Sequence, residues 1–185
     1  SADSLQLPIG NAAEFNDTGY LVIEKEFDNG NYTRDTNFAL SFFISASNTG
    51  TTTQTVIKKA ATRSPFHITV LPNKKLQFMM HGALVANDVT SSYNSGSATI
   101  FVTSSTAVSS SWNHVVCQKS GSYMQMYVNG ALQANVYQPL LRIPKSPSTQ
   151  SLRIDCDADI NIGLNYLGKL DEFRIYNKSL TSAQV

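Results

Sequence analysis

The sequence has 185 residues, which is long enough for one domain that buries most of its apolar surface. Charged residues make up only 15% of it and the formal net charge is +1. The charges are scattered without runs, so we expect no binding to nucleic acid or to an anionic membrane. No stretch approaches the roughly 20 apolar residues that cross a bilayer, and we expect no membrane insertion. The polar residues are mostly Ser, Thr and Asn, which favour turns and hairpin loops over helices and predict an all-β protein.

Alternation of apolar and polar residues, the pattern of a half-buried strand, recurs through the first half of the chain. From Phe38 to Ala46 every even-numbered residue is apolar, which predicts one buried face. Two further alternating segments flank Pro72-Asn73-Lys74, and this arrangement predicts a hairpin. The expected strands in this half are residues 20–24, 38–46, 54–59, 66–70 and 76–80.

The same alternation continues in the second half. Between residues 123 and 128, methionine and valine alternate with tyrosine and glutamine, and Asn129-Gly130 then supplies a dipeptide typical of a tight type I′ turn. One short helix is expected at residues 179–185, with Ser179 or Thr181 as its cap. The expected strands are residues 99–103, 112–119, 123–128, 132–137, 152–156, 160–162 and 169–176. Because parallel sheets need crossover helices, these strands predict an antiparallel β-sandwich or jelly roll.

Three segments carry a family resemblance. Residues 112–116 begin with Trp112-Asn113-His114-Val115 and lead into residues 124–130, which end in Tyr127-Val128-Asn129-Gly130. Residues 168–177 read Gly-Lys-Leu-Asp-Glu-Phe-Arg-Ile-Tyr-Asn and precede the tail 178–185, and residues 14–21 form a looser match. These segments resemble the laminin-G-like (LamG/pentraxin-like) branch of the concanavalin A-like lectin/glucanase superfamily. Its strands carry "W-x-H-V", "L-Y-V-N/D-G", "G-x-I-D-E-V-R-I-Y-N" and "F-D-G-x-x-D-Y-V".

The resemblance implies a concanavalin A-like jelly roll over residues 1–185, a single domain that we expect to be part of a longer protein. It also implies a non-catalytic module for carbohydrate binding or adhesion, at an extracellular, cell-surface or virion-surface location. The expected partner is a glycan or glycoprotein, beside the neighbouring domains of the parent protein. Two alternatives stay open: a structural or protein-interaction domain, and a divergent glycoside hydrolase.

Sugar recognition uses aromatic faces to stack on a pyranose and planar amides to bond its hydroxyl groups. Tyr123, Gln125 and Tyr127 share the polar face of one expected strand, so we predict that they bind the ligand. Cross-strand pairing on the sheet surface is the alternative role for these tyrosines. Further candidates at loops or strand ends are Tyr93 with Asn94, Asn135 with Tyr137, and Asn165 with Tyr166.

The resemblance also implies Ca²⁺ near the rim where the first and last strands meet. Hard cations take carboxylate oxygens, and Asp17 and Asp171 stand in the two family motifs that meet there. Asn16-Asp17-Thr18 departs from the family's "D-G-x", so the register of the first ligand is open. A salt bridge or a bond to backbone amides is the alternative role for Asp171.

Catalysis has a single candidate. Asp155, Asp157 and Asp159 would lie on one face of a strand, but Ile160 stands where a glucanase would carry its final acid. An acidic turn or a cation site are the other interpretations of this segment. The three histidines are dispersed without the spacing of zinc ligands. Cys117 and Cys156 are either one disulfide or inert buried thiols.

Overall fold

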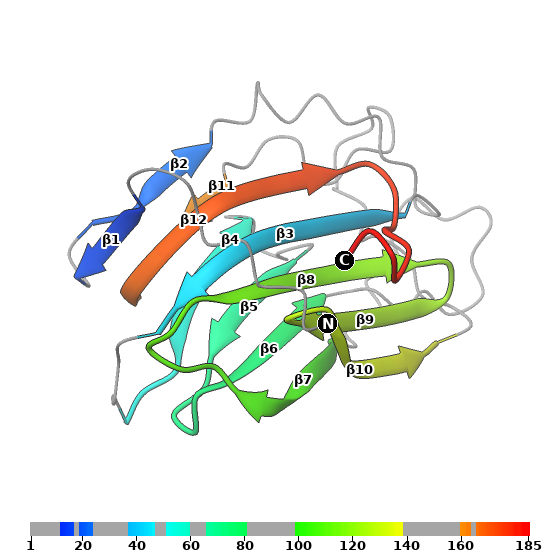
Figure 1. The fold of residues 1–185 in the computed structure, drawn as a ribbon, viewed down its shortest axis with the longest axis horizontal. Helices are drawn as coiled ribbons and strands as arrows, with labels where there is room; N and C mark the ends of the chain where they lie inside the picture. Colours follow the sequence, from blue (N-terminus) through cyan, green and yellow to red (C-terminus); the bar gives the residue numbers. More distant parts are fainter. Residues whose placement is uncertain are drawn as a thin grey trace, which may run out of the picture.

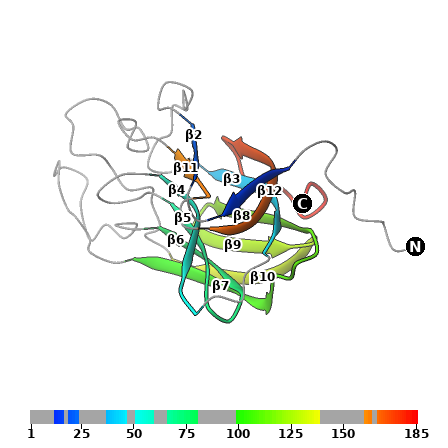
Figure 2. The same cartoon turned by 90° about the vertical axis from the view of Figure 1, so that its left-hand side faces the viewer.

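The computed structural model describes residues 12–16, 19–23, 37–46, 51–59, 66–80, 99–138, 160–163 and 166–185. In these residues twelve strands form two antiparallel six-stranded sheets (Figure 1). Figure 2 shows the sheets as two stacked layers. The all-β jelly-roll prediction is therefore confirmed. None of the described residues lies in a helix with the length and apolar character needed to cross a membrane.

Each sheet combines strands from both halves of the chain. Sheet A has, in spatial order, β1 (Ala13–Asn16), β12 (Leu167–Tyr176), β3 (Phe38–Ser45), β8 (Asn113–Ser120), β9 (Tyr123–Val128) and β10 (Ala131–Tyr137). Sheet B has β2 (Leu21–Ile23), β11 (Ile160–Ile162), β4 (Gln54–Lys59), β5 (His67–Val70), β6 (Lys75–Met80) and β7 (Ile100–Ala107). Among the described strands, the edges are therefore β1 and β10 in sheet A and β2 and β7 in sheet B.

The core fills the space between the two sheets, where the inward side chains of each strand meet. From sheet A, β3 contributes Phe38, Leu40, Phe42 and Ile44, all at most 1% exposed. The facing residues of sheet B include Ile57, Ile68, Leu76, Phe78 and Met80, all fully buried. The even-numbered residues of β3 thus face the core as predicted, while Ala39, Ser41 and Ser45 on its other face are also buried.

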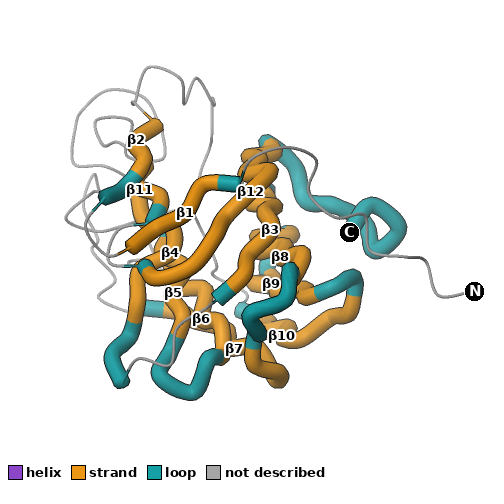
Figure 3. Tube along the Cα trace, turned by 60° about the vertical axis from the view of Figure 1, so that its left-hand side comes forward, coloured by secondary structure: helices purple, strands orange, loops and turns teal. Residues whose placement is uncertain are grey.

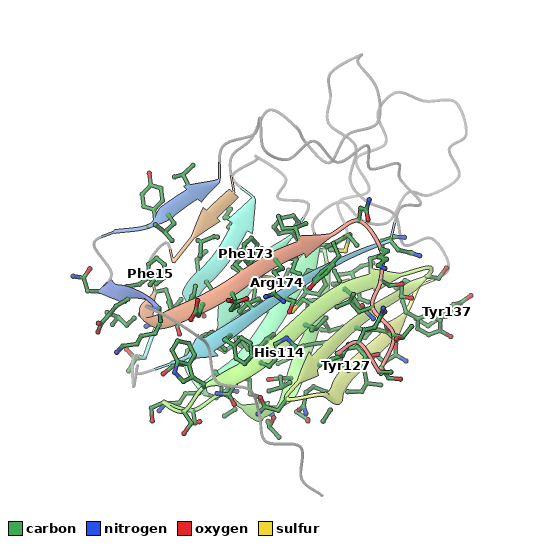
Figure 4. All side chains as sticks on the ribbon, turned by 45° about the horizontal axis from the view of Figure 1, so that its top comes forward. Phe15, His114, Tyr127, Tyr137, Phe173 and Arg174 are labelled. Carbon is green, nitrogen blue, oxygen red and sulfur yellow. The ribbon has the colours of Figure 1, made fainter. Side chains whose placement is uncertain are left out.

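The closing strand β12 follows the same rule with one irregularity. Phe173 and Ile175 are partly buried and pack against the core, as predicted, while Arg174 is exposed (Figure 4). A β-bulge interrupts the pairing of β12 with β3 between Asp171 and Arg174, and Glu172 there has a φ of 52°. The bulge adds one residue to β12, and after it the side chains again alternate between the core and the surface.

One side chain joins the two sheets where their edges meet. The Oε1 atom of Gln133 on β10 accepts hydrogen bonds from the hydroxyl of Ser105 and from the amide and hydroxyl of Thr106, both on β7. Strands β7 and β10 are neighbours along this side of the sandwich. Gln133 is the residue that a second β-bulge inserts into β10, between Leu132 and Ala134.

Most expected strands lie where the sequence places them, and three details differ. Strand β1 was not predicted, β7 extends to Ala107, and residues 181–185 form a hydrogen-bonded turn instead of a helix. Both the Gln184 and Val185 amides donate to the carbonyl of Thr181 there, and Figure 3 draws this part as a loop. The expected strand 152–156 lies outside the described residues.

Candidate ligand-binding face

Tyr123, Gln125 and Tyr127 lie on the outer face of sheet A, because Met124 and Met126 between them are fully buried in the core. The three side chains differ in exposure. Tyr123 is 40% exposed, Gln125 is partly exposed, and Tyr127 is only 8% exposed. That these residues bind a ligand stays a prediction. Of the two tyrosines, Tyr123 is accessible and Tyr127 is buried.

The chain covers Tyr127 with residues 177–185, which we call the C-terminal segment. It turns back over the outer face of sheet A (Figure 1). Leu180 forms a buried cluster with Ala39, Val116 and Tyr127, and Tyr176 and Val185 pack at its margin. In Figure 4 Tyr127 lies close to this segment, whereas Tyr137 lies at the margin of the molecule. A ligand therefore reaches the Tyr127 ring only if the C-terminal segment moves away.

The neighbouring edge of sheet A carries a second tyrosine that completes an exposed patch. Tyr137 pairs with Tyr123 and Asn135 pairs with Gln125, so the four side chains point outward together. The rings of Tyr123 and Tyr137 are 5.1 Å apart between centroids and tilted by 52°. Tyr137 is 56% exposed and Asn135 is also exposed. We call Tyr123, Gln125, Asn135 and Tyr137 the platform.

The bulge at Gln133 is the reason that Asn135 and Tyr137 belong to the platform. The turn at Asn129-Gly130, with φ of 51° and 76°, sets Val128 opposite Ala131. Uninterrupted pairing from there would put Val136 opposite Tyr123 and direct Tyr137 into the core, but the extra residue shifts the register by one. The sequence indicated Asn135 with Tyr137 as a further candidate. It could not place this pair beside Tyr123, because a single inserted residue determines which face of the sheet the two side chains point to.

Gln118 connects the platform with the C-terminal segment. Its side chain is 1% exposed. The Leu180 amide donates to Gln118 Oε1 over 2.8 Å, and Gln118 Nε2 donates to the Leu180 carbonyl over 3.2 Å. The same Nε2 donates to Gln125 Oε1 over 2.8 Å. Gln118 therefore fixes the orientation of the Gln125 amide.

His114 holds the other end of this face together. Its Nε2 lies 2.9 Å from Ser41 Oγ, and its ring packs against Phe43 with centroids 5.0 Å apart. Burial lowers the pKa of His114, a hydrogen bond with the backbone of Val185 opposes this, and the charge of Arg174 lowers the pKa further. These contacts give His114 a structural role.

The calcium expectation rests on Asp171, because Asp17 lies outside the described residues. Asp171 Oδ1 accepts a hydrogen bond from the Glu172 amide over 2.8 Å, whereas Oδ2 is buried without a partner in the described part of the chain. A buried carboxylate oxygen of this kind suits a hard cation. Within the same residues no three His, Cys, Asp or Glu side chains gather as metal ligands. Calcium binding stays a prediction.

The other candidates are placed as follows. Tyr166 is fully buried and donates to the Ser45 carbonyl over 2.9 Å, so it is a core residue. Cys117 is a free thiol in the core, and burial raises its pKa. Tyr93, Asn94, Cys156, Asn165 and the trio Asp155, Asp157 and Asp159 lie outside the described residues. The carboxylates that are described are those of Glu14, Asp171 and Glu172.

A laminin G family model, described as the concanavalin A-like lectin/glucanases superfamily, matches residues 18–185. The chain belongs to this superfamily. Its physical signature is visible in the closing strand, where a Cβ on Gly168 would lie 2.4 Å from both the Ser45 carbonyl oxygen and the Tyr166 hydroxyl. The glycine of the family motif is thus needed for close packing.

Solved structures agree on the fold. The binding domain of botulinum neurotoxin serotype D has a TM-score of 0.68 and 15% identity, with all of this chain and 43% of that chain covered. The sialidase module CBM40 of Ruminococcus gnavus, bound to α2,3 sialyllactose, has a TM-score of 0.65 and 11% identity, with 94% of each chain covered. Domain 4 of the arabinanase AbnA from Geobacillus stearothermophilus, in complex with arabinotriose, has a TM-score of 0.60 and 16% identity. It is covered over 75% of its length, and 95% of this chain is covered.

The chain spans less than half the length of the botulinum neurotoxin chains that it matches. No curated protein matches it significantly in sequence.

Proposed function

We propose that this domain is a non-catalytic carbohydrate-binding module that holds a glycan on the platform of Tyr123, Gln125, Asn135 and Tyr137. The observation that carries the proposal is the exposed tyrosine pair, 5.1 Å apart between ring centroids, with two amides on the same face. Aromatic rings stack on the apolar face of a pyranose, and amides bond its hydroxyl groups. Two of the similar structures are named as complexes with sialyllactose and arabinotriose, which supports the same class of ligand.

The arrangement of the platform favours recognition of a surface-presented or extended glycan. The tyrosines stand on β9 and on the edge strand β10, so a long ligand can continue past the edge of the sheet. Binding needs no acid or base, because the ligand leaves unchanged. The proposed location is extracellular, on a cell or virion surface, where glycans and glycoproteins are accessible partners, and the proposed wider role is adhesion.

A glycan array followed by calorimetric titration tests this function. We expect at least one oligosaccharide to bind, and Tyr137→Ala to weaken its binding at least tenfold, because each exposed ring contributes stacking area. Phe101→Ala is the matched control, since Phe101 is 55% exposed but stands on β7 of the other sheet. Absence of binding to every glycan, or equal losses in the two variants, contradicts the proposal.

A protein-interaction role is the second candidate, and edge strand β2 favours it. Tyr20, Leu21 and Val22 are consecutive and 52%, 52% and 44% exposed. Water-exposed apolar side chains in this density are typical of contact surfaces. This role is supported if the protein forms a stable oligomer or complex that Leu21→Lys disrupts and if it binds no glycan.

A further inference from the structure

We infer that Gln118 acts as a positioning residue that makes Gln125 a hydrogen-bond donor toward the ligand, and that the site is thereby adapted to neutral N-acetylated glycans. The inference rests on the proposed function and adds to it the class of sugar. It follows from the chain of hydrogen bonds that runs from Leu180 through Gln118 to Gln125.

The orientation of Gln118 is fixed by the backbone. A glutamine amide fits many sites in either of two orientations, with oxygen and nitrogen exchanged. Here the Leu180 N–H requires the oxygen of Gln118 at 2.8 Å, and the Leu180 carbonyl requires the nitrogen at 3.2 Å. Since backbone groups have a single polarity, only one orientation satisfies both contacts.

The orientation of Gln125 follows from that of Gln118. The remaining N–H of the buried Gln118 points at Gln125 and needs an acceptor, which is Oε1 at 2.8 Å. The oxygen of Gln125 is therefore engaged on the protein side. Its Nε2, with two hydrogens, has no hydrogen-bond partner in the described part of the chain and is the group left for a ligand. Through Gln118, the C-terminal segment thus determines that Gln125 presents a hydrogen-bond donor to a ligand.

A fixed donor distinguishes among sugar groups. A hydroxyl both donates and accepts, so it tolerates either orientation of Gln125, whereas a carboxylate or an acetamido carbonyl only accepts. Strands β9 and β10 contain no charged residue, and Lys119 on β8 is 1% exposed and donates to the Gly121 carbonyl. A carboxylate would lose its hydration here without gaining a cation from β8, β9 or β10. The acetamido carbonyl is the acceptor that fits, and its methyl group can pack on a tyrosine ring.

The test compares two trisaccharides that differ in one group per sugar. Triacetylchitotriose carries acetamido groups where cellotriose carries hydroxyl groups. We expect the wild-type protein to bind the former about tenfold more tightly, the effect of one well-placed hydrogen bond. Gln125→Glu keeps an acceptor for Gln118 and presents a second oxygen to the ligand. It should remove this preference, because a carboxylate oxygen cannot donate to the acetamido carbonyl.

Two further variants separate positioning from folding. Gln118→Glu cannot donate to Gln125, so the Gln125 amide is expected to turn and the same preference to disappear, with the fold checked by circular dichroism. Gln77→Glu, an amide on β6 of the other sheet, is the matched control and should keep the preference.

Three outcomes overturn the inference. They are equal binding of the two trisaccharides by the wild-type protein, tighter binding of cellotriose, and binding of neither. The proposed function survives each of them if another glycan binds and Tyr137→Ala weakens it, so the two failures are distinguishable. A preference for triacetylchitotriose that persists in Gln125→Glu also overturns the inference.

Discussion

The phenol of Tyr166 donates a hydrogen bond to the backbone carbonyl of Ser45, 2.9 Å away and 121 residues earlier in the chain. The contact joins the residue that precedes β12 to the end of β3. Burial raises the pKa of the phenol, so the hydroxyl keeps its proton. Tyr166→Phe should lower the free energy of unfolding by about 1–2 kcal/mol, since a buried acceptor loses a partner. Urea denaturation measures it, and Tyr137→Phe, at an exposed site, should leave stability unchanged.

Gly168 lies directly against this hydrogen bond. Gly168→Ala would place a methyl group 2.4 Å from two oxygen atoms, at a φ of 154° that side chains rarely adopt. We expect a loss of about 3 kcal/mol or failure to fold, measured by thermal and urea unfolding. Gly19→Ala is the control because no atom lies within 4 Å of its added Cβ. Equal stability of the two variants would show that the chain relaxes around Gly168.

Leu180 anchors the C-terminal segment to sheet A. Leu180→Ala should cost about 2 kcal/mol, at the lower end for a leucine truncation because the site is near the surface. The exposed fraction of Tyr127 should rise at the same time, detectable as greater quenching of tyrosine fluorescence. Leu21→Ala, on β2 of the other sheet and 52% exposed, should change neither quantity. An unchanged stability in Leu180→Ala would mean that the segment is held by its hydrogen bonds alone.

The stability of the domain should depend on pH through His114. Its pKa is lowered in the folded state, chiefly by burial, so the unfolded chain takes up the proton first as the pH falls. Stability is therefore complete above the ordinary pKa of about 6.5 and decreases as the pH falls below it, toward the folded-state pKa. Denaturation midpoints between pH 5 and 8 measure the effect. His114→Gln should flatten the profile in this range; an identical slope would assign it to another group.

Calcium binding at Asp171 has a direct test. The melting temperature should rise with millimolar CaCl₂, fall again with a chelator, and stay constant in Asp171→Asn, which keeps the oxygen that accepts from the Glu172 amide. If the wild-type protein shows no response, the buried Oδ2 atom is simply an unsatisfied acceptor of the bulge.

The alternation of apolar and polar residues predicted the buried faces, because each residue of such a strand is apolar or polar according to whether it faces the core. Strands β4 and β11 begin and end where the sequence places them. Strand β7 continues past Thr103 through a run of Ser and Thr that is typical of loops, and Ser104 is nevertheless buried, with its hydroxyl bonded to the Leu76 amide. Strand β1 has a single buried apolar residue, Phe15, which is too weak a pattern to indicate a strand.

The site was predictable only in part. Alternation places Tyr123 and Tyr127 on one outer face, yet it contains no information on which distant segment of the chain covers that face. Where a helix was expected, the chain forms a turn in which the Gln184 side chain accepts from the Thr181 amide, and Leu180 beside it packs on the sheet. The covering of Tyr127 by Leu180 depends on contacts between distant residues, which local patterns do not encode.

The hydrogen bonds that join Gln133 on β10 to β7 also determine at which edges of the folded domain another strand can add. An uncovered edge strand offers unpaired amides and carbonyls to any other chain in extended conformation. At one side of the sandwich, β7 and β10 are held against each other by the bonds to Gln133. In the described part of the chain this leaves β1 and β2 as the edges that are not joined to the other sheet in this way. Among the described strands, β1 and β2 are therefore the edges at which another extended chain would add, and charged substitutions there are the means to suppress it.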